Sequence, residues 1–147
     1  MDLSSRRDQF RVLFVLAAMW NLAGGILGYF NTAYSFELLF GRALADPLYF
    51  AIYRGACGTT LIYFVGYLVV AFDPQRHAGV VLVGGIGKVG YAHQLTKFYS
   101  AGLAGANALV VIVGDLMFSL AFLAYGLWVS RAHWGRDVDA RRCIERA

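Results

Sequence analysis

The stretch Gly84-Gly-Ile-Gly-Lys-Val-Gly-Tyr-Ala-His-Gln94 decides the fold of this chain, because it is apolar and rich in glycine yet carries a lysine, a histidine and a glutamine. No strand pattern precedes it and it contains no GxxxxGK motif, so its glycines do not indicate a phosphate-binding loop. In a membrane helix, glycines permit close contact between helices, or a local unwinding that exposes backbone carbonyls to a ligand. The stretch therefore predicts a membrane helix that carries polar groups into a bundle.

The composition indicates that the chain is a membrane protein. Of its 147 residues 59% are hydrophobic and 15% are charged, and the mean hydropathy is +0.57, which lies outside the range of a soluble domain. Four apolar segments reach the roughly 17–25 residues that cross a hydrocarbon core; they lie at residues 10–30, 47–72, 78–95 and 104–130. We predict an all-α, polytopic membrane protein, an antiparallel four-transmembrane-helix bundle forming a single domain of residues 1–147.

The first apolar segment follows two arginines, as in a signal peptide, but it is too long for one and no cleavage site follows it, so we interpret it as a retained helix.

Basic residues are divided unequally between the two sides of the predicted bundle. With both termini in the cytoplasm, only Arg42 and Lys97 lie outside, and the inner side holds Arg6, Arg7, Arg11, Arg76, Arg131, Arg136, Arg141, Arg142 and Arg146. This bias predicts cytoplasmic termini, with residues 131–147 as a cytoplasmic tail, and explains the net charge without a nucleic-acid partner.

Residues 31–46, between the first two predicted spans, are amphipathic. They predict a short interfacial helix or a re-entrant segment on the outer face, ending near Gly41 and covering the end of the bundle. The pair Asp46-Pro47 predicts the start of the second span, with Asp46 as the N-cap and Pro47 as the first helical residue.

Lys88 and Asp115 are charged residues inside two consecutive predicted spans. Counting about 1.5 Å per residue from the span ends puts both about 15 Å deep, so we predict an ion pair between them. Asn21 falls at the same depth, either in the same site or as a packing amide. Tyr91 is only about 60° from Lys88 around the helix and is expected beside it. The pair is interpreted either as part of a ligand-binding site or as a device that fixes helix register.

Arg54, His93 and Gln94 fall at a second, outer depth. Arg54 is expected either to face a ligand or to extend along its own stem toward the outer surface. On a regular helix His93 lies about 140° from Lys88 and Gln94 about 120° the other way, so only one of them joins the outer layer unless the glycines distort the helix.

Several chemistries are not favoured by the sequence. Cys57 and Cys143 form no CxxC or metal-ligand pattern, so we expect no metal site and no cofactor of the chain's own. No nucleophile can be paired with a base by spacing, so no catalytic residue is predicted and an enzyme is the least supported class.

The chain resembles small bacterial four-helix membrane proteins of the broad DoxX-like kind at Trp20-Asn21, Arg54-Gly55, Asp73-Pro74, Gly84 to Tyr91 and Gly114-Asp115. The resemblance implies an antiparallel four-helix bundle in the bacterial cytoplasmic (inner) membrane. For some relatives it also implies association with membrane redox or quinol-oxidising systems. No catalytic residue is carried over by it.

These observations favour a membrane protein whose polar cluster receives the head of a hydrophobic ligand, a quinone or a membrane lipid, or that serves as an accessory subunit of a larger membrane complex. The sequence supports a purely structural membrane subunit almost equally well. A small transporter is a further class, and with four helices per chain it would need at least a dimer.

Overall fold

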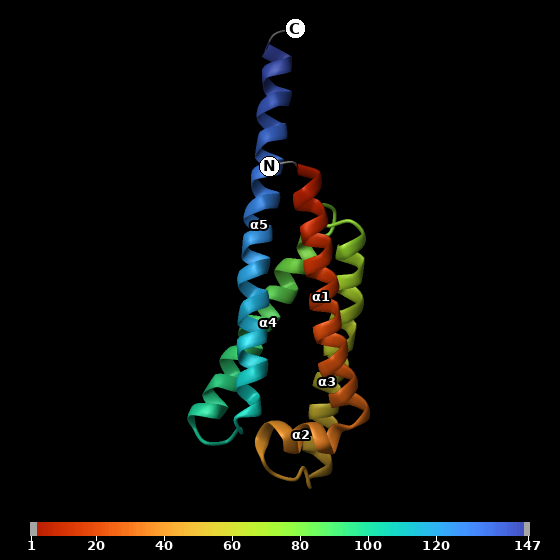
Figure 1. Cartoon of the computed structure of the whole chain (residues 1–147), viewed down its shortest axis with the longest axis vertical. Helices are drawn as coiled ribbons and strands as arrows, with labels where there is room; N and C mark the ends of the chain where they lie inside the picture. Colours follow the sequence, from red (N-terminus) through yellow and green to blue (C-terminus); the bar gives the residue numbers. More distant parts are fainter. Residues whose placement is uncertain (1–2, 146–147) are drawn as a thin grey trace.

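The computed structural model describes the backbone of residues 3–145 and the side chains of residues 6–131. Within residues 3–145 the chain forms five α-helices and no strand (Figure 1): α1 (Leu3–Phe30), α2 (Thr32–Phe40), α3 (Pro47–Phe72), α4 (Ala78–Ser100) and α5 (Asn107–Glu145). One end of the molecule holds the start of α1, the end of α5 and the turn between α3 and α4. We call it the tail end. The opposite end, where α2 lies, is called the α2 end.

Three helices among the described residues are long and apolar enough to cross a membrane: Arg6–Phe30 of α1, Pro47–Phe72 of α3 and Asn107–Arg131 of α5. The α4 helix, at 23 residues, is also long enough to cross a membrane. It is less apolar than these three, however, and is not apolar enough to be counted with them. Large apolar side chains remain exposed on the outside of the helices, for example Ile62 at 71% and Leu120 at 69%. Such a surface suits lipid rather than water.

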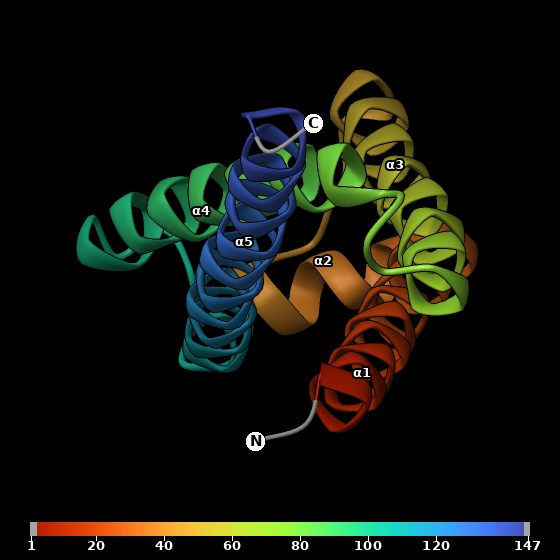
Figure 2. The ribbon, with the colours of Figure 1, turned by 90° about the horizontal axis from the view of Figure 1, so that it is seen from above.

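The four long helices pack as two antiparallel pairs (Figures 1 and 2). The closest and most extensive pairings are α1 with α3 and α4 with α5. On α1, Gly25 and Gly28 allow α3 to approach, because a Cβ on Gly28 would collide with the Cys57 side chain and one on Gly25 would meet Leu61 Cδ2 at 2.6 Å. Gly24, one turn before Gly28, makes no such contact, because no atom lies within 4 Å of its Cβ position.

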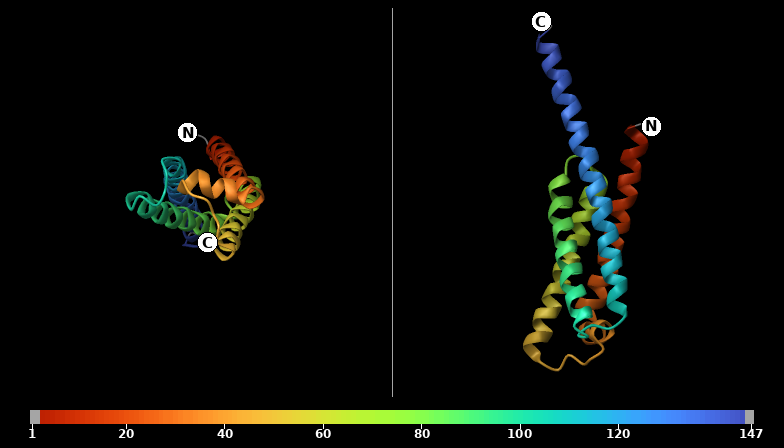
Figure 3. Two further views of the ribbon diagram at one scale, coloured as in Figure 1. Left: turned by 90° about the horizontal axis from the view of Figure 1, so that it is seen from below. Right: turned by 90° about the vertical axis from the view of Figure 1, so that its left-hand side faces the viewer.

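The α2 helix confirms the prediction of a short helix between the first two predicted spans, and it lies across one end of the molecule (Figure 3). It ends at Gly41, which adopts φ 65°, a left-handed conformation that glycine adopts without a steric penalty. Asn107 Nδ2 donates to the Leu38 carbonyl at 3.1 Å, and the Gly105 N–H donates to the Leu39 carbonyl at 2.7 Å. The α4–α5 turn thereby satisfies carbonyls that the end of α2 leaves free.

The predicted start of the second span is also confirmed. The Asp46 carboxylate accepts hydrogen bonds from the backbone N–H groups of Leu48 at 2.8 Å and Tyr49 at 3.3 Å, and Pro47 is the first residue of α3. Other boundaries differ from the predicted spans: α4 continues to Ser100 and α5 begins at Asn107. The α5 helix also continues beyond the last predicted span, so the backbone of the expected tail is helical as far as Glu145.

Two groups of buried apolar side chains lie on either side of the middle of the bundle. The tail-end core unites all four long helices through side chains that include Phe14, Tyr67, Val81, Phe122 and Tyr125. The α2-end core is smaller, and its described members, Leu95, Ala108 and Ile112 with Phe40, Phe98, Ala104 and Val111, come from α2, α4, α5 and the turn between α4 and α5. The α1–α3 pair is thus packed directly against the α4–α5 pair mainly in the tail-end half.

Candidate functional site

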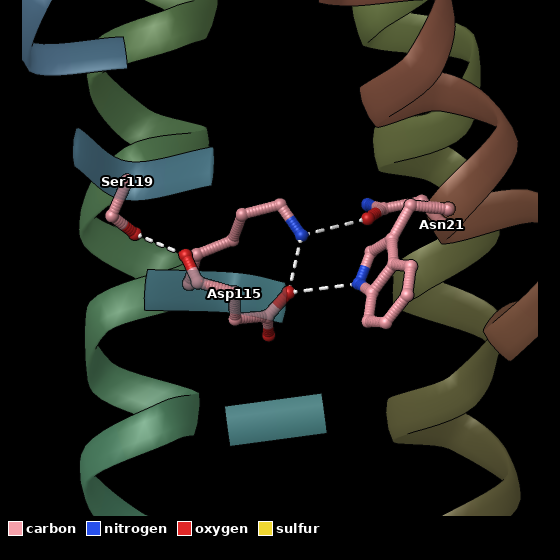
Figure 4. Close-up of polar contacts among 5 residues, drawn as sticks. Asn21, Asp115 and Ser119 are labelled. Carbon is pink, nitrogen blue, oxygen red and sulfur yellow. Dashed lines mark hydrogen bonds and ion pairs between the residues drawn. The ribbon is translucent and has the colours of Figure 1, made fainter. Parts of the chain in front are cut away.

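The site predicted around Lys88 lies between the two cores, and Figure 4 shows its polar contacts. Lys88 Nζ lies 2.6 Å from Asp115 Oδ1, which confirms the predicted ion pair, and it donates a second hydrogen bond to Asn21 Oδ1 at 2.9 Å. Lys88, Asp115 and Asn21 are 6%, 5% and 6% exposed. One ammonium group therefore links α1, α4 and α5 in the interior of the protein.

A fourth residue, Trp20, completes what we call the central cluster: Trp20, Asn21, Lys88 and Asp115. The indole Nε1 of Trp20 donates to Asp115 Oδ1 at 3.1 Å, so this oxygen accepts from both Lys88 and Trp20. Gly114 makes the approach possible, because a Cβ at this position would collide with the six-membered ring of Trp20. Lys88 Nζ also lies 5.4 Å from the centre of the Phe118 ring, within the range of a cation–π interaction.

The helices position these side chains by their ordinary periodicity. One face of α4 is buried, at a spacing of three or four residues, and Lys88 is its only charged member; the face consists of Val81, Gly84, Lys88, Ala92 and Leu95. On α5, Ser119 Oγ donates to the Asp115 carbonyl at 2.7 Å, so its hydroxyl is satisfied within the helix. Asp115 and Ser119 are both visible in Figure 4.

The central cluster retains hydrogen-bonding capacity that its own members do not use. An ammonium group has three donors, and Lys88 uses two of them within the described part of the chain. Among the same residues, the hydrogen bonds to the Asp115 carboxylate all reach Oδ1, so Oδ2 accepts none. Its two charged members cancel, so the cluster presents a free donor and a free acceptor without a net charge.

Tyr67 adds a further unused donor nearby. Its side chain is fully buried, its hydroxyl has no partner among the described residues, and it packs against Gly84, where a Cβ would collide with it. Gly84 is one helical turn from Lys88. A buried polar group without a partner needs an explanation, and a ligand or a bound water at the cluster would supply one.

The other residues predicted for this site do not take part in its hydrogen bonds. Arg54 is exposed, and its guanidinium carbon lies 4.6 Å from the centre of the Tyr29 ring. Tyr91 is 44% exposed, and His93 and Gln94 are exposed. None of these four donates to or accepts from the central cluster among the described side chains, so the structure brings together the predicted midplane residues without the predicted outer layer.

Sequence reasoning missed the roles of Trp20 and Tyr67. Trp20 was visible next to Asn21, but an indole in a membrane span is ordinarily read as apolar bulk. The available signal was Gly114 directly before Asp115, since a glycine there leaves room for a large side chain beside the carboxylate. Tyr67 could not be distinguished from the other tyrosines of α3, because its significance depends on its burial and on the contact with Gly84.

A second polar contact lies nearer the α2 end. Ser35 Oγ and Tyr53 Oη are 2.9 Å apart, and Ser35 is 5% exposed. Among the described residues there is no group of three or more histidine, cysteine, aspartate or glutamate side chains that could hold a metal ion.

The chain matches no protein-family model, and no curated protein or solved structure is significantly similar to it.

Proposed function

We propose that this chain is a multi-pass protein of the bacterial cytoplasmic membrane, with four spans and cytoplasmic termini, whose central cluster binds the polar head of a hydrophobic ligand, a quinone or a membrane lipid. The membrane assignment is supported by the three long apolar helices and by the exposed apolar side chains. The orientation is supported by the unequal distribution of arginine and lysine. The DoxX-like resemblance supports the connection to quinones.

The observation that carries the proposal is the buried cluster with unused donors and an unused acceptor. Placing a charged residue in a membrane span costs about 2.5–3.5 kcal/mol on insertion scales, and such residues commonly mark functional sites. A pair that served only to fix helix register would be expected to use its hydrogen-bonding capacity internally. Here one donor of Lys88 and Oδ2 of Asp115 remain unused among the described residues.

The chemistry of the cluster favours a neutral head that accepts a hydrogen bond. Lys88 and Asp115 neutralise each other at 2.6 Å, so a fully anionic head placed at the ammonium would also lie close to a carboxylate and be repelled. A quinone carbonyl, or the ester carbonyl of a lipid, can accept from the third ammonium proton without bringing a charge. The apolar tail of either molecule suits the lipid-facing surface of the helices.

The test is to measure which lipids and quinones remain with the protein purified in a mild detergent. Wild type should retain one species in stoichiometric amount by mass spectrometry. The double variant Lys88→Met/Asp115→Leu, which leaves no unpaired charge, should lose it. Lys97→Met removes an exposed lysine from the same helix and should retain it. Equal retention by wild type and both variants would contradict the proposal.

A second candidate is a subunit of a larger membrane assembly, favoured by the face of α4 opposite Lys88. Gly79 and Gly90 have no atom within 4 Å of their Cβ positions, and His93 and Gln94 are exposed on the same side. Each of these two side chains can both donate and accept, so a second copy related by a two-fold axis could satisfy them. A dimer mass in native mass spectrometry, lost on His93→Leu/Gln94→Leu, would support this candidate, and a monomer mass for wild type would argue against it.

A further inference from the structure

Packing between the two helix pairs differs strongly between the two ends of the molecule. On the tail side of the central cluster, the tail-end core fills the space with side chains of all four long helices. Its aromatic rings are in contact: Phe14 with Tyr125 at 4.9 Å and Tyr67 with Phe122 at 5.2 Å between ring centres. On the other side, the α2-end core contains no side chain of α1 or α3 among its described members. The cluster is therefore closed toward the tail end.

The boundary between α3 and α4 opens in the α2-end half. Near the tail end the two helices touch: the Gly66 Cβ position lies 3.2 Å from Val80 Cγ1, and Gly84 packs against Tyr67. One turn further, the Gly87 Cβ position is still 3.7 Å from the Tyr63 hydroxyl. Beyond this contact the ribbons of α3 and α4 diverge (Figures 1 and 2).

Tyr91 lies just beyond the last of these contacts. It is about 60° from Lys88 around α4, on the side of the helix that carries Gly84 and Gly87 toward α3. Its side chain is 44% exposed, whereas Lys88, one turn earlier, is 6% exposed. Tyr91 thus connects the open part of the boundary with the buried site.

We propose that the central cluster is entered from the side, through the α2-end half of the boundary between α3 and α4, and that Tyr91 is the first polar group that a ligand head contacts there. The identity of the ligand rests on the proposed function, whereas the position of the entrance does not. The proposed topology places this entrance in the outer leaflet. The ligand is a lipid-soluble molecule whose head accepts hydrogen bonds, first from the Tyr91 hydroxyl and then from the third proton of Lys88.

The position of the entrance can be tested with single cysteines in a Cys57→Ser/Cys143→Ser background. A membrane-impermeant cationic thiosulfonate is added to right-side-out or inside-out vesicles. The proposed entrance is expected to hold water beside the charged groups of the central cluster, so Tyr91→Cys should be modified, and only when the reagent is on the side of α2. Val81→Cys, in the tail-end core, should stay unmodified from either side. Ile86→Cys, whose native side chain is 66% exposed on the outside of α4, should also stay unmodified, because thiols react poorly in lipid. Modification of Val81→Cys from the tail side, or no modification of Tyr91→Cys, would overturn the entrance.

Decylubiquinone, a quinone with a short tail, then tests the ligand separately. It should slow the modification of Tyr91→Cys. If Tyr91→Cys reacts from the α2 side but decylubiquinone gives no protection, the entrance stands and the quinone proposal fails. With the native cysteines present, Tyr91→Phe should weaken decylubiquinone binding by about 2–10-fold, the loss of one hydrogen bond. Tyr99→Phe, an exposed tyrosine of the same helix, should leave binding unchanged, and equal affinities of the two variants would overturn the role of Tyr91.

Discussion

At the scale of single residues, Asp115 holds the central cluster together through one oxygen. Its Oδ1 accepts from the Lys88 ammonium and from the Trp20 indole, and the same ammonium reaches Asn21 on α1. Buried hydrogen bonds that involve charge are stronger than neutral ones, but desolvation of both ions opposes the gain. The pair therefore need not stabilise the fold, although separating its members should be very unfavourable.

The first prediction is a double-mutant cycle on this pair. Lys88→Met leaves a buried carboxylate without its counter-ion, and Asp115→Leu leaves a buried ammonium, so each should destabilise the detergent-solubilised protein by about 3–5 kcal/mol. The double variant removes both charges and should recover most of that loss. Thermal unfolding followed by circular dichroism measures all four proteins. Additive losses would mean that the two residues are not coupled in the protein.

The second prediction concerns Gly114. An alanine there would collide with the Trp20 ring, so the indole must move away from Asp115 at a cost of about 1–3 kcal/mol. Gly24→Ala is the matched control, because no atom lies within 4 Å of its Cβ position. The control should be neutral or slightly stabilising, since alanine favours helices over glycine by about 1 kcal/mol. The measurement is the unfolding temperature of each variant relative to wild type. Equal shifts for the two variants would contradict the packing described for Trp20.

The midplane residues of the site were predictable because depth in a helical span follows from counting residues. A constant rise per residue placed Lys88, Asp115 and Asn21 at one level, and the structure brings them together. Direction around the helix was not predictable in the same way. The angles around the helix predicted that His93 and Gln94 point away from Lys88, but only the packing shows which sides of α4 are covered, and it leaves both residues exposed.

At the scale of elements, the described residues of α4 are buried along one face. Its glycines were expected to allow close packing, and Gly84 does so against Tyr67. Gly79 and Gly90 meet no neighbour within 4 Å in the single chain. Glycine content alone could not separate these cases, because the same residue type serves a contact at one position and leaves a bare face at another.

The third prediction concerns the attachment of α2 to the rest of the bundle. Asn107→Ala removes the donor to the Leu38 carbonyl, a contribution of about 0.5–1.5 kcal/mol. Amide hydrogen exchange in α2 should become about 2–10-fold faster as this end opens more often. Thr59→Ala is a suitable control, because among the described residues the Thr59 hydroxyl donates only to the Gly55 carbonyl of its own helix. Unchanged exchange in the Asn107 variant would show that the bond does not hold α2.

The existence of α2 and the start of α3 were readable from local chemistry, because a glycine stop and an Asp-Pro start act within a few residues. The attachment of α2 was not readable. Besides the Ser35 contact with Tyr53 of α3, its hydrogen-bond partners include the Gly105 N–H and the Asn107 side chain, which lie far along the chain and reach α2 only when α4 and α5 are packed in place. Long-range contacts of this kind leave no periodic signal in the sequence.

At the scale of the whole molecule, the protein consists of two helix pairs joined by the tail-end core, by the central cluster and by α2. The turn between α3 and α4 is short, and the two helices are neighbours at the tail end. Sequence order did not reveal that the more extensive partner of α3 is α1. Close approach at Gly25 and Gly28 favours that pairing, and the bulky tyrosines of α3 hold α4 at a greater distance.

The fourth prediction tests whether α4 crosses the membrane. Among the described residues, only α1, α3 and α5 are long and apolar enough to be counted as candidate spans. The α4 helix nevertheless packs along α5 and runs in the opposite direction (Figure 3). If all four cross with the N-terminus inside, reporter fusions after Arg42 and Leu103 should report outside, and a fusion after Arg76 should report inside.

Cys143 in the C-terminal segment provides an independent readout of the same prediction. With four spans it lies in the cytoplasm, and in intact cells of a Cys57→Ser variant it should react with a membrane-permeant maleimide but not with an impermeant one. With three spans, the segment after α5 would face outward and carry Arg136, Arg141, Arg142 and Arg146 with it, against the positive-inside bias. Labelling by the impermeant reagent would therefore exclude α4 as a span, and Lys88 would then lie at the membrane surface rather than at its centre.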